Sequence, residues 1–194
     1  MVKNAVHAER LEACSALGSM RNQQPRSILD TNGLRIIEEP FLHIISLRKS
    51  RRQLDNATVN NWLRSIGLGL PQVPNALCGD AGLGCCWLEP NAWLVTAAAP
   101  VAMRAAETGL LPTIISDRLA VFRLKGPMAT QLIAAGCDPS IVRNGACART
   151  RFASFATVLI QQWGDQDYRL LLDVSLARGF ADWLLDASRA NEIN

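Results

Sequence analysis

The sequence predicts an α+β protein with mostly antiparallel sheets, built from two βαββα units in tandem. Predicted strands and helices follow the order strand–helix–strand–strand–helix, and this order occurs twice along the chain. Aromatic residues repeat with it, since Trp87 and Trp163 are 76 positions apart and Trp93 and Tyr168 are 75 apart. In each unit one of these residues precedes the hairpin turn and the other follows it. An internal duplication is the economical explanation.

Two parts of unequal length are predicted along the chain. Residues 1–33 are rich in Asn, Gln, Ser and Arg and lack a sustained periodicity, apart from a short candidate helix over 8–17. We expect them to form a polar N-terminal arm that becomes ordered only on a partner. Residues 34–190 form the predicted domain, and its repeat halves cover about 34–111 and 112–190.

The first unit opens with a strand over 41–47, where β-branched and aromatic residues follow the break at Pro40. A helix over 57–66 comes next, because four apolar residues share one face and Gly67 ends the pattern. Those four residues are Val59, Trp62, Leu63 and Ile66. A loop rich in Pro and Gly then covers 68–84.

A hairpin and a helix complete the first unit. The two strands of the hairpin are predicted over 85–88 and 93–97, joined by the turn Glu89-Pro90-Asn91-Ala92. Pro100 suits the first turn of a helix that runs through about Thr108. The first unit therefore reads strand–helix–strand–strand–helix.

The second unit repeats this order. A strand is predicted over 119–124, a helix that Gly136 ends follows it, and a hairpin covers 152–161 and 168–174. Ser175 can cap the last helix, because its hydroxyl is a good acceptor for free backbone N–H groups. The apolar stripe of that helix consists of Leu176, Phe180, Trp183, Leu184 and Ala187.

The composition is that of an ordinary folded protein. Of 194 residues, 49% are hydrophobic and 19% are charged, and the net charge of +3 is too low for disorder over the whole chain. The longest uncharged windows, 65–79 and 90–103, contain proline and fall short of the ~20 apolar residues of a membrane-spanning helix. No secretory signal is visible in 1–18. We therefore expect a soluble, cytoplasmic protein.

The usual residues of an enzyme site are scarce. The six cysteines contain no Cys-x-x-Cys pair, and the two histidines, His7 and His43, complete no cluster of zinc ligands. Nucleophile elbows, phosphate-binding loops and dinucleotide fingerprints are also missing from the sequence. His43 lies in an apolar run, which is more typical of a hydrogen-bonded core or face histidine than of a catalytic base. We expect no catalytic, cofactor-binding or metal-ligating residue in this chain.

Basic residues gather in one short segment that contains Arg48, Lys49, Arg51 and Arg52. Such a cluster can contact phosphates, but nucleic-acid-binding domains usually present a whole basic face. A solvated loop or a contact with an acidic protein partner is the interpretation that we favour. A nucleic-acid contact stays the alternative.

A second basic pair, Arg149 and Arg151, is separated by two positions, so on a strand both side chains face the same side. They either pair with carboxylates of a partner subunit or line a solvated strand edge. Most tryptophans belong in the core, yet one or two can anchor a partner, and Cys147 is expected to be a buried thiol. The candidate subunit interface comprises Arg149, Arg151, Trp93, Arg48 and Arg52.

Several segments follow the order and approximate spacing of one known family. They are Gly67-Leu68-Gly69-Leu70-Pro71, Trp87-Leu88-Glu89-Pro90-Asn91-Ala92-Trp93, Arg118-Leu119-Ala120-Val121-Phe122-Arg123-Leu124-Lys125-Gly126-Pro127, Cys147-Ala148-Arg149-Thr150-Arg151 and Phe180-Ala181-Asp182-Trp183-Leu184. Over about 34–188 the chain resembles the gamma subunit of heterotetrameric sarcosine oxidase. The Cys-Ala-Arg-Thr-Arg stretch and the hairpin bounded by tryptophans are the most specific parts of this resemblance.

The resemblance implies a small, non-catalytic companion subunit with the fold of the aminomethyltransferase folate-binding domain, here two ferredoxin-like βαββα repeats. Its partners would be alpha, beta and delta subunits, and no binding to nucleic acid or to a membrane is expected. The family's complex oxidatively demethylates sarcosine to glycine and passes the one-carbon unit to tetrahydrofolate. FAD, covalently held FMN and NAD are expected in the larger subunits, with no cofactor in this chain.

One departure bears on the folate chemistry. Where the related aminomethyltransferases have an Asp-Asp pair before the hairpin turn, the nearest positions here are Thr157 and Val158. Neither side chain can offset positive charge that develops near a folate amine, so we expect no transfer chemistry in this chain. The alternatives are a subunit of a related N-methyl amino acid dehydrogenase or oxidase, and a stand-alone folate-binding one-carbon protein.

Overall fold

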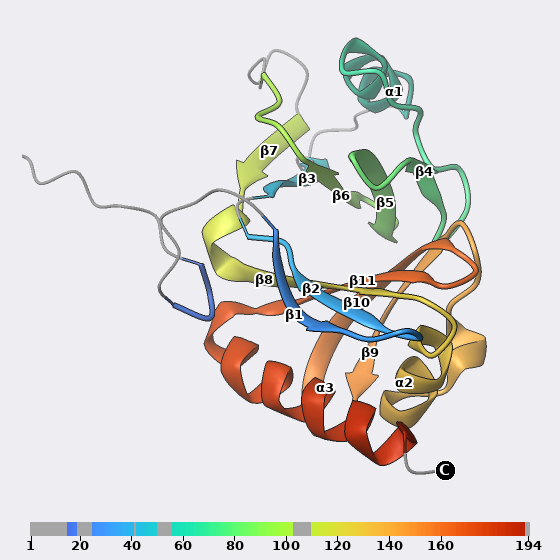
Figure 1. Cartoon of the computed structure of the whole chain (residues 1–194). Coiled ribbons are helices and arrows are strands. Elements are labelled where there is room, and N and C mark those ends of the chain that lie inside the picture. The colour runs from blue at the N-terminus through green and yellow to red at the C-terminus, as the bar shows by residue number, and fades with distance from the viewer. Residues whose placement is uncertain (1–14, 19–24, 41, 50–55, 103–109, 193–194) are drawn as a thin grey trace, which may run out of the picture.

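Two antiparallel sheets packed face to face form the centre of the molecule, and helices cover their outer faces (Figure 1). The computed structural model describes residues 15–18, 25–40, 42–49, 56–102 and 110–192. Helix α1 (Asn56–Ser65) packs on one sheet, and helices α2 (Ala129–Gly136) and α3 (Ala177–Glu192) pack on the other. The predicted α+β class with mostly antiparallel sheets is confirmed.

The sheet beside α1 has five strands, and each neighbouring pair is antiparallel. In spatial order they are β4 (Leu77–Gly79), β5 (Leu83–Glu89), β6 (Ala92–Ala97), β3 (His43–Lys49) and β7 (Leu110–Ile114). The predicted apolar face of α1 turns toward this sheet, since Val59, Trp62 and Leu63 are buried against it.

The sheet beside α2 and α3 has six strands, again with antiparallel neighbours. In spatial order they are β1 (Arg26–Asp30), β2 (Arg35–Glu38), β8 (Leu119–Lys125), β11 (Asp167–Asp173), β10 (Phe155–Gly164) and β9 (Ala146–Phe152). Short 3-10 helices are η1 (Ser116–Arg118), η2 (Pro139–Ile141) and η3 (Val174–Leu176).

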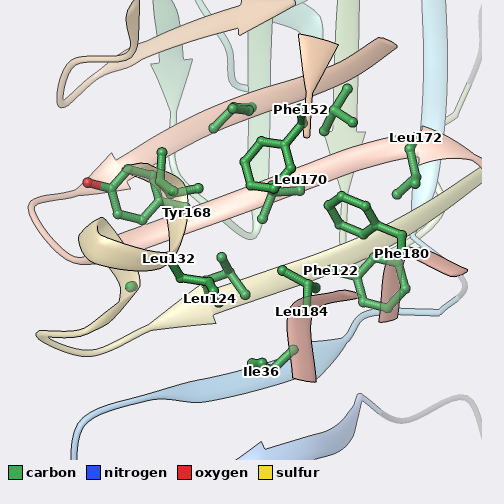
Figure 2. Packing of buried hydrophobic residues seen from close by; sticks show 14 of the residues in the cluster. Ile36, Phe122, Leu124, Leu132, Phe152, Tyr168, Leu170, Leu172, Phe180 and Leu184 are labelled. Carbon is green, nitrogen blue, oxygen red and sulfur yellow. The ribbon is translucent and has the colours of Figure 1, made fainter. Parts of the chain in front are cut away.

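An aromatic cluster fills the space between the six-stranded sheet and its two helices (Figure 2). The ring of Phe180 on α3 lies 5.5 Å from the rings of Phe122 and Phe152, and Phe152 lies 5.2 Å from Trp183. Burial of each such side chain contributes roughly 1.5–3 kcal/mol to stability. The predicted apolar stripe of the last helix therefore serves as its packing face, apart from Leu176, which lies in η3 and is exposed.

The two units match in topology, and each contains two strands more than predicted: a leading strand (β2 or β7) and the strand after the first helix (β4 or β9). Along the chain β3, α1, β4, β5 and β6 correspond to β8, α2, β9, β10 and β11, and the spatial orders β4-β5-β6-β3 and β9-β10-β11-β8 agree. The predicted strand over 152–161 corresponds to β10, which begins at Phe155, and β9, which ends at Phe152, was not predicted. Ala153 makes the turn with a positive φ of 49°, and no Gly, Asn or Pro marks it in the sequence.

The strand that leads each unit pairs with the other unit's sheet. β2 directly precedes β3, but it pairs with β8 in the six-stranded sheet. β7 directly precedes β8, but it pairs with β3 in the five-stranded sheet. This reciprocal exchange ties the two halves of the chain together.

Other predicted boundaries also differ from the structure. β1 lies inside the range 1–33 and pairs with β2, and the backbone N–H of Leu17 donates to Glu38, so parts of the predicted arm contact the sheet. Residues 100–102 are not helical, and the rest of the helix predicted there lies outside the described residues. Asp173 rather than Ser175 provides the cap near α3, because its carboxylate accepts from the Ser175 backbone. The division at residue 34 and the repeat limits stay predictions.

Candidate functional site

The layer between the two sheets holds the features that bear on function. Its middle is apolar and receives buried side chains from both sheets: Leu42, Ile44, Cys86, Leu94, Val121, Cys147, Leu159 and Leu171. Polar and charged groups gather at the two ends of this layer. Each end is hollowed by a cavity.

At one end, four charged side chains form a connected network. Arg169 on β11 donates from Nε to Glu39 Oε2 at 2.6 Å, and Arg123 on β8 donates from Nη1 to Glu39 Oε1 at 3.2 Å. Arg123 also holds both oxygens of Asp167, at 2.7 and 2.6 Å. The side chain of Arg169 is only 1% exposed, and its Nη2 donates to the carbonyl of Ala81 at 2.7 Å. The network therefore joins the six-stranded sheet to the β4–β5 turn of the other sheet.

The charged groups of this network neutralise one another, as in a network that stabilises the fold. Burial by itself raises the pKa of Asp167, but the hydrogen bonds and positive charges of Arg123 and Lys125 outweigh it and lower that pKa overall. The cavity beside the network has a volume of about 390 Å³, and Glu39, Arg123 and Arg169 line it. Their guanidinium and carboxylate groups bind one another there.

In the middle of the layer two thiols from different sheets lie close together. Cys147 on β9 donates to the carbonyl of Trp87 at 3.4 Å, and Gln161 Nε2 lies 3.5 Å from the sulfur of Cys86. The hydrogen bond to Cys86 and burial raise the pKa of the Cys147 thiol, so it stays protonated and unreactive. This agrees with the prediction that Cys147 is a buried thiol.

At the other end, a cavity of about 490 Å³ opens between the sheets. We call it the inter-sheet cleft. Its apolar lining comes from both sheets and includes Leu88, Leu94, Leu159 and Leu171. Its charged lining consists of Arg48, Arg118, Arg149 and Asp173. Three guanidinium groups face one carboxylate of the lining and a second one, Glu89, beside Arg149, so the rim keeps a small excess of positive charge.

The charged groups of the rim differ in how they are engaged. Arg149 Nη1 lies 3.3 Å from Glu89 Oε1, and both side chains are nearly half exposed, at 45% and 47%. Asp173 accepts from the hydroxyl and the backbone N–H of Ser175, and these bonds, with a smaller effect of Arg118, lower the pKa of Asp173. Among the described residues, Arg48 has no ion-pair partner. Within this described part, a carboxylate from outside would therefore meet a free guanidinium group at Arg48, whereas at Arg149 it would share the guanidinium group with Glu89.

The structure brings two of the predicted interface residues together and separates the others. Arg48 and Arg149 both line the inter-sheet cleft. Arg151 is exposed farther along β9, where its Nε donates to the carbonyl of Ala153 at 3.3 Å. Trp93 is 2% exposed in the core beside α1, so it offers a partner no surface and is removed from the candidate interface. Arg52 lies outside the described residues.

Sequence reasoning missed Arg118 and the network around Arg169. Arg169 on β11 and Arg123 on β8 are register partners. The two residues are 46 positions apart, and no local pattern in the sequence predicts that their strands pair. The expectation for His43 agrees with the structure, since its Nδ1 accepts from the Val101 backbone at 2.9 Å. Thr157 lines the inter-sheet cleft, whereas Val158 is buried on the opposite face of the strand.

Within the described part of the chain, no three His, Cys, Asp or Glu side chains lie together as metal ligands. Among the helices that the structure describes, none combines the length and the apolar character needed to cross a membrane.

Comparison with known proteins agrees with the predicted resemblance. No protein-family model matches the chain. Sarcosine oxidase subunit gamma from Corynebacterium sp. (strain U-96) is 29% identical to it over 133 residues. That match covers 63% of this chain and 65% of the relative, so it spans less than two thirds of the relative's length.

A solved structure shares the fold. It is the heterotetrameric sarcosine oxidase from Corynebacterium sp. U-96 in complex with pyrrole 2-carboxylate, with a TM-score of 0.68 and 22% sequence identity. The superposition covers 83% of this chain and 86% of the matched chain. The resemblance inferred from the sequence is thereby confirmed as a similarity: part of the chain is similar in sequence to a sarcosine oxidase gamma subunit, and the chain shares its fold with a chain of the solved complex.

Proposed function

We propose that this chain is a non-catalytic gamma subunit of a heterotetrameric sarcosine oxidase. The observation that carries the proposal is the sequence match to a sarcosine oxidase gamma subunit, together with a shared fold over most of the chain. In this role the domain over 34–190 binds alpha, beta and delta subunits and supports their structure. Arg48, Arg149 and Arg151 are the proposed interface residues, because each is exposed and none belongs to the buried network.

The chemistry of the assembly belongs to the partner subunits in this proposal. They carry FAD, FMN and NAD, demethylate sarcosine to glycine, and pass the one-carbon unit to tetrahydrofolate. In this chain the buried charges support that division, since Arg123 and Arg169 are bound by Glu39 and Asp167. Groups held in this way stabilise the fold and are poorly placed to bind a substrate.

Co-expression tests the proposal directly. The tagged chain is produced together with the proposed alpha, beta and delta subunits, purified, and assayed for subunit content and sarcosine oxidation. We expect all four chains to co-purify, and we expect the three others to lose soluble yield without this one. A complex of the other three that forms and works equally well without it would contradict the proposal.

Two titrations separate the alternatives. Purified alone, the chain should carry no flavin absorbance and should not bind tetrahydrofolate in calorimetry. Saturable tetrahydrofolate binding by the isolated chain would favour a stand-alone one-carbon protein. Oxidation of another N-methyl amino acid by the co-purified complex, in preference to sarcosine, would favour the related dehydrogenase or oxidase.

A further inference from the structure

The inter-sheet cleft continues onto an apolar surface outside its cavity. Leu111 on β7 is 52% exposed and lies beside Arg48, its register partner on β3. Alternation along the strand places Leu111 on the same side of the sheet as Thr113, which lines the cleft. Ile115 and Leu119, which line the cleft, are half-buried. Apolar surface thus reaches from the cavity to the exposed Leu111 at its edge, which is typical of a surface that another protein covers.

The charges and the lining of the cleft define what can enter it. An apolar side chain would contact Leu94, Leu159 and Leu171 deep in the cavity. A carboxylate beside it would meet the guanidinium groups of Arg48 and Arg149 at the rim. Arginine suits this role because it can bind a carboxylate through two parallel hydrogen bonds and tolerates an interface well.

We infer that the inter-sheet cleft receives a segment of a partner subunit in which a carboxylate neighbours a large apolar side chain. This inference rests on the proposed function and names the place on this chain where the partner docks. A protein segment fits better than a small organic acid, because the exposed Leu111 lies outside the cavity and needs a larger occupant to cover it.

Charge reversal tests the rim. The double variant Arg48→Glu and Arg149→Glu is co-expressed with the alpha, beta and delta subunits, and the recovery of the chain in the purified complex is measured. We expect a loss of about tenfold or more, since like charges would now face the partner's carboxylate. The matched control is Arg143→Glu, an exposed arginine in the loop before β9 that does not line the cleft. Circular dichroism and thermal unfolding of the isolated variants check that they fold.

Photo-crosslinking identifies the occupant without disturbing the charges. A benzoyl-phenylalanine at Thr113 in the cleft is compared with one at Gln131, an exposed residue of α2 on the opposite side of the six-stranded sheet. We expect the first to crosslink to one partner peptide that contains Asp or Glu beside a large apolar residue. A crosslink to a second copy of this chain, or to a segment without a carboxylate, would overturn the inference.

The outcomes also separate this inference from the proposed function. If the wild-type chain does not join the complex, both are wrong. If it joins and the double variant joins equally well, only the cleft inference is wrong. Laurate serves as a probe for a small organic acid. Stoichiometric laurate binding that the double variant loses, with assembly unchanged, would assign the cleft to a small molecule and overturn the inference.

Discussion

Arg169 shows how a single buried charge joins the two sheets. Its guanidinium group binds Glu39 and the carbonyl of Ala81, and it lies 6.0 Å from the centre of the Trp163 ring. A buried ion pair is by itself weak evidence for stability, because desolvation offsets much of the attraction. Removing one partner of the pair lowers stability strongly, since it leaves the other partner's charge buried with fewer contacts.

Replacing Arg169 with Leu should therefore lower the free energy of unfolding by about 3–5 kcal/mol, as measured by urea denaturation. Glu39 would keep only its longer bond to Arg123. The control is Arg35→Leu, because Arg35 and Asp30 form a pair that is more than half exposed, and its loss should change stability by at most about 1 kcal/mol. A loss at Arg169 no larger than that of the control would contradict this interpretation of the network.

The lowered pKa of Asp167 predicts how stability depends on pH. Burial opposes ionisation, but Arg123 and Lys125 favour it more strongly, so the folded state binds the proton less tightly than the unfolded state. The contribution of Asp167 is complete above its unfolded pKa of about 4 and is lost as the pH falls through the lower folded pKa.

Urea unfolding at a series of pH values below about 6 checks this expectation. The difference in unfolding free energy between wild type and Asp167→Asn should be greatest near neutral pH and should shrink in acid. Asp30→Asn, at an exposed pair, is the matched control. A difference that stays constant, or grows as the pH falls, would show that Asp167 is not held ionised by its neighbours.

At the scale of elements, the contact between β5 and β10 depends on a residue without a side chain. A Cβ at Gly84 would lie 2.1 Å from Cη2 of Trp163 on the facing sheet, so even a methyl group forces the ring or the strands to move. The close packing of Gly84 and Trp163 therefore sets the separation of the two sheets at this point.

Gly84→Ala should destabilise the protein by about 1–3 kcal/mol in urea unfolding. Gly69→Ala is the matched control, because nothing lies within 4 Å of a Cβ there, and it should be neutral or slightly stabilising. Combining Gly84→Ala with Trp163→Leu should restore part of the loss, since the smaller side chain makes room. Additive effects of the two changes would show that they do not share this contact.

Several elements were predictable from the sequence because they carry their own signals. α1 has an apolar face that Gly67 ends, and the β5–β6 turn contains Pro90 and Asn91. The turn between β9 and β10 carries no such signal, because Ala153 adopts its positive φ without a residue that favours it. β4 has only three residues inside a Pro/Gly-rich segment, too few for a periodicity.

The site was less predictable than the fold, because it depends on contacts between distant segments. The spacing of Arg149 and Arg151 places both on one side of any strand that contains them. That Arg149 shares a cleft with Arg48 depends on the packing of two sheets, which no local pattern encodes. Trp93 was placed in the interface from the general preference of tryptophan for contacts, but its position in the middle of β6 buries it.

At the scale of the whole molecule, the exchange of β2 and β7 predicts cooperative unfolding. The six-stranded sheet contains β2, which a few residues connect to β3 of the other sheet, and the five-stranded sheet contains β7, which a few residues connect to β8. Complete opening of either sheet therefore releases a strand that is tied to the other sheet. In native-state hydrogen exchange, the slowest amides of β5–β6 and of β10–β11 should open with free energies within about 1 kcal/mol of each other. Ile36→Ala in β2 should speed both sets alike. An independent, low-energy opening of the five-stranded sheet would contradict this expectation.

The same exchange has a consequence for the origin of the chain. If one unit existed alone, its leading strand would have no sheet to pair with. The sheet of that unit would also have an unpaired edge strand. Two identical copies would resolve both problems by trading leading strands, which is the arrangement of a symmetric domain-swapped dimer. The present polypeptide has the geometry of such a dimer fused end to end, with its former subunit boundary running between the two sheets.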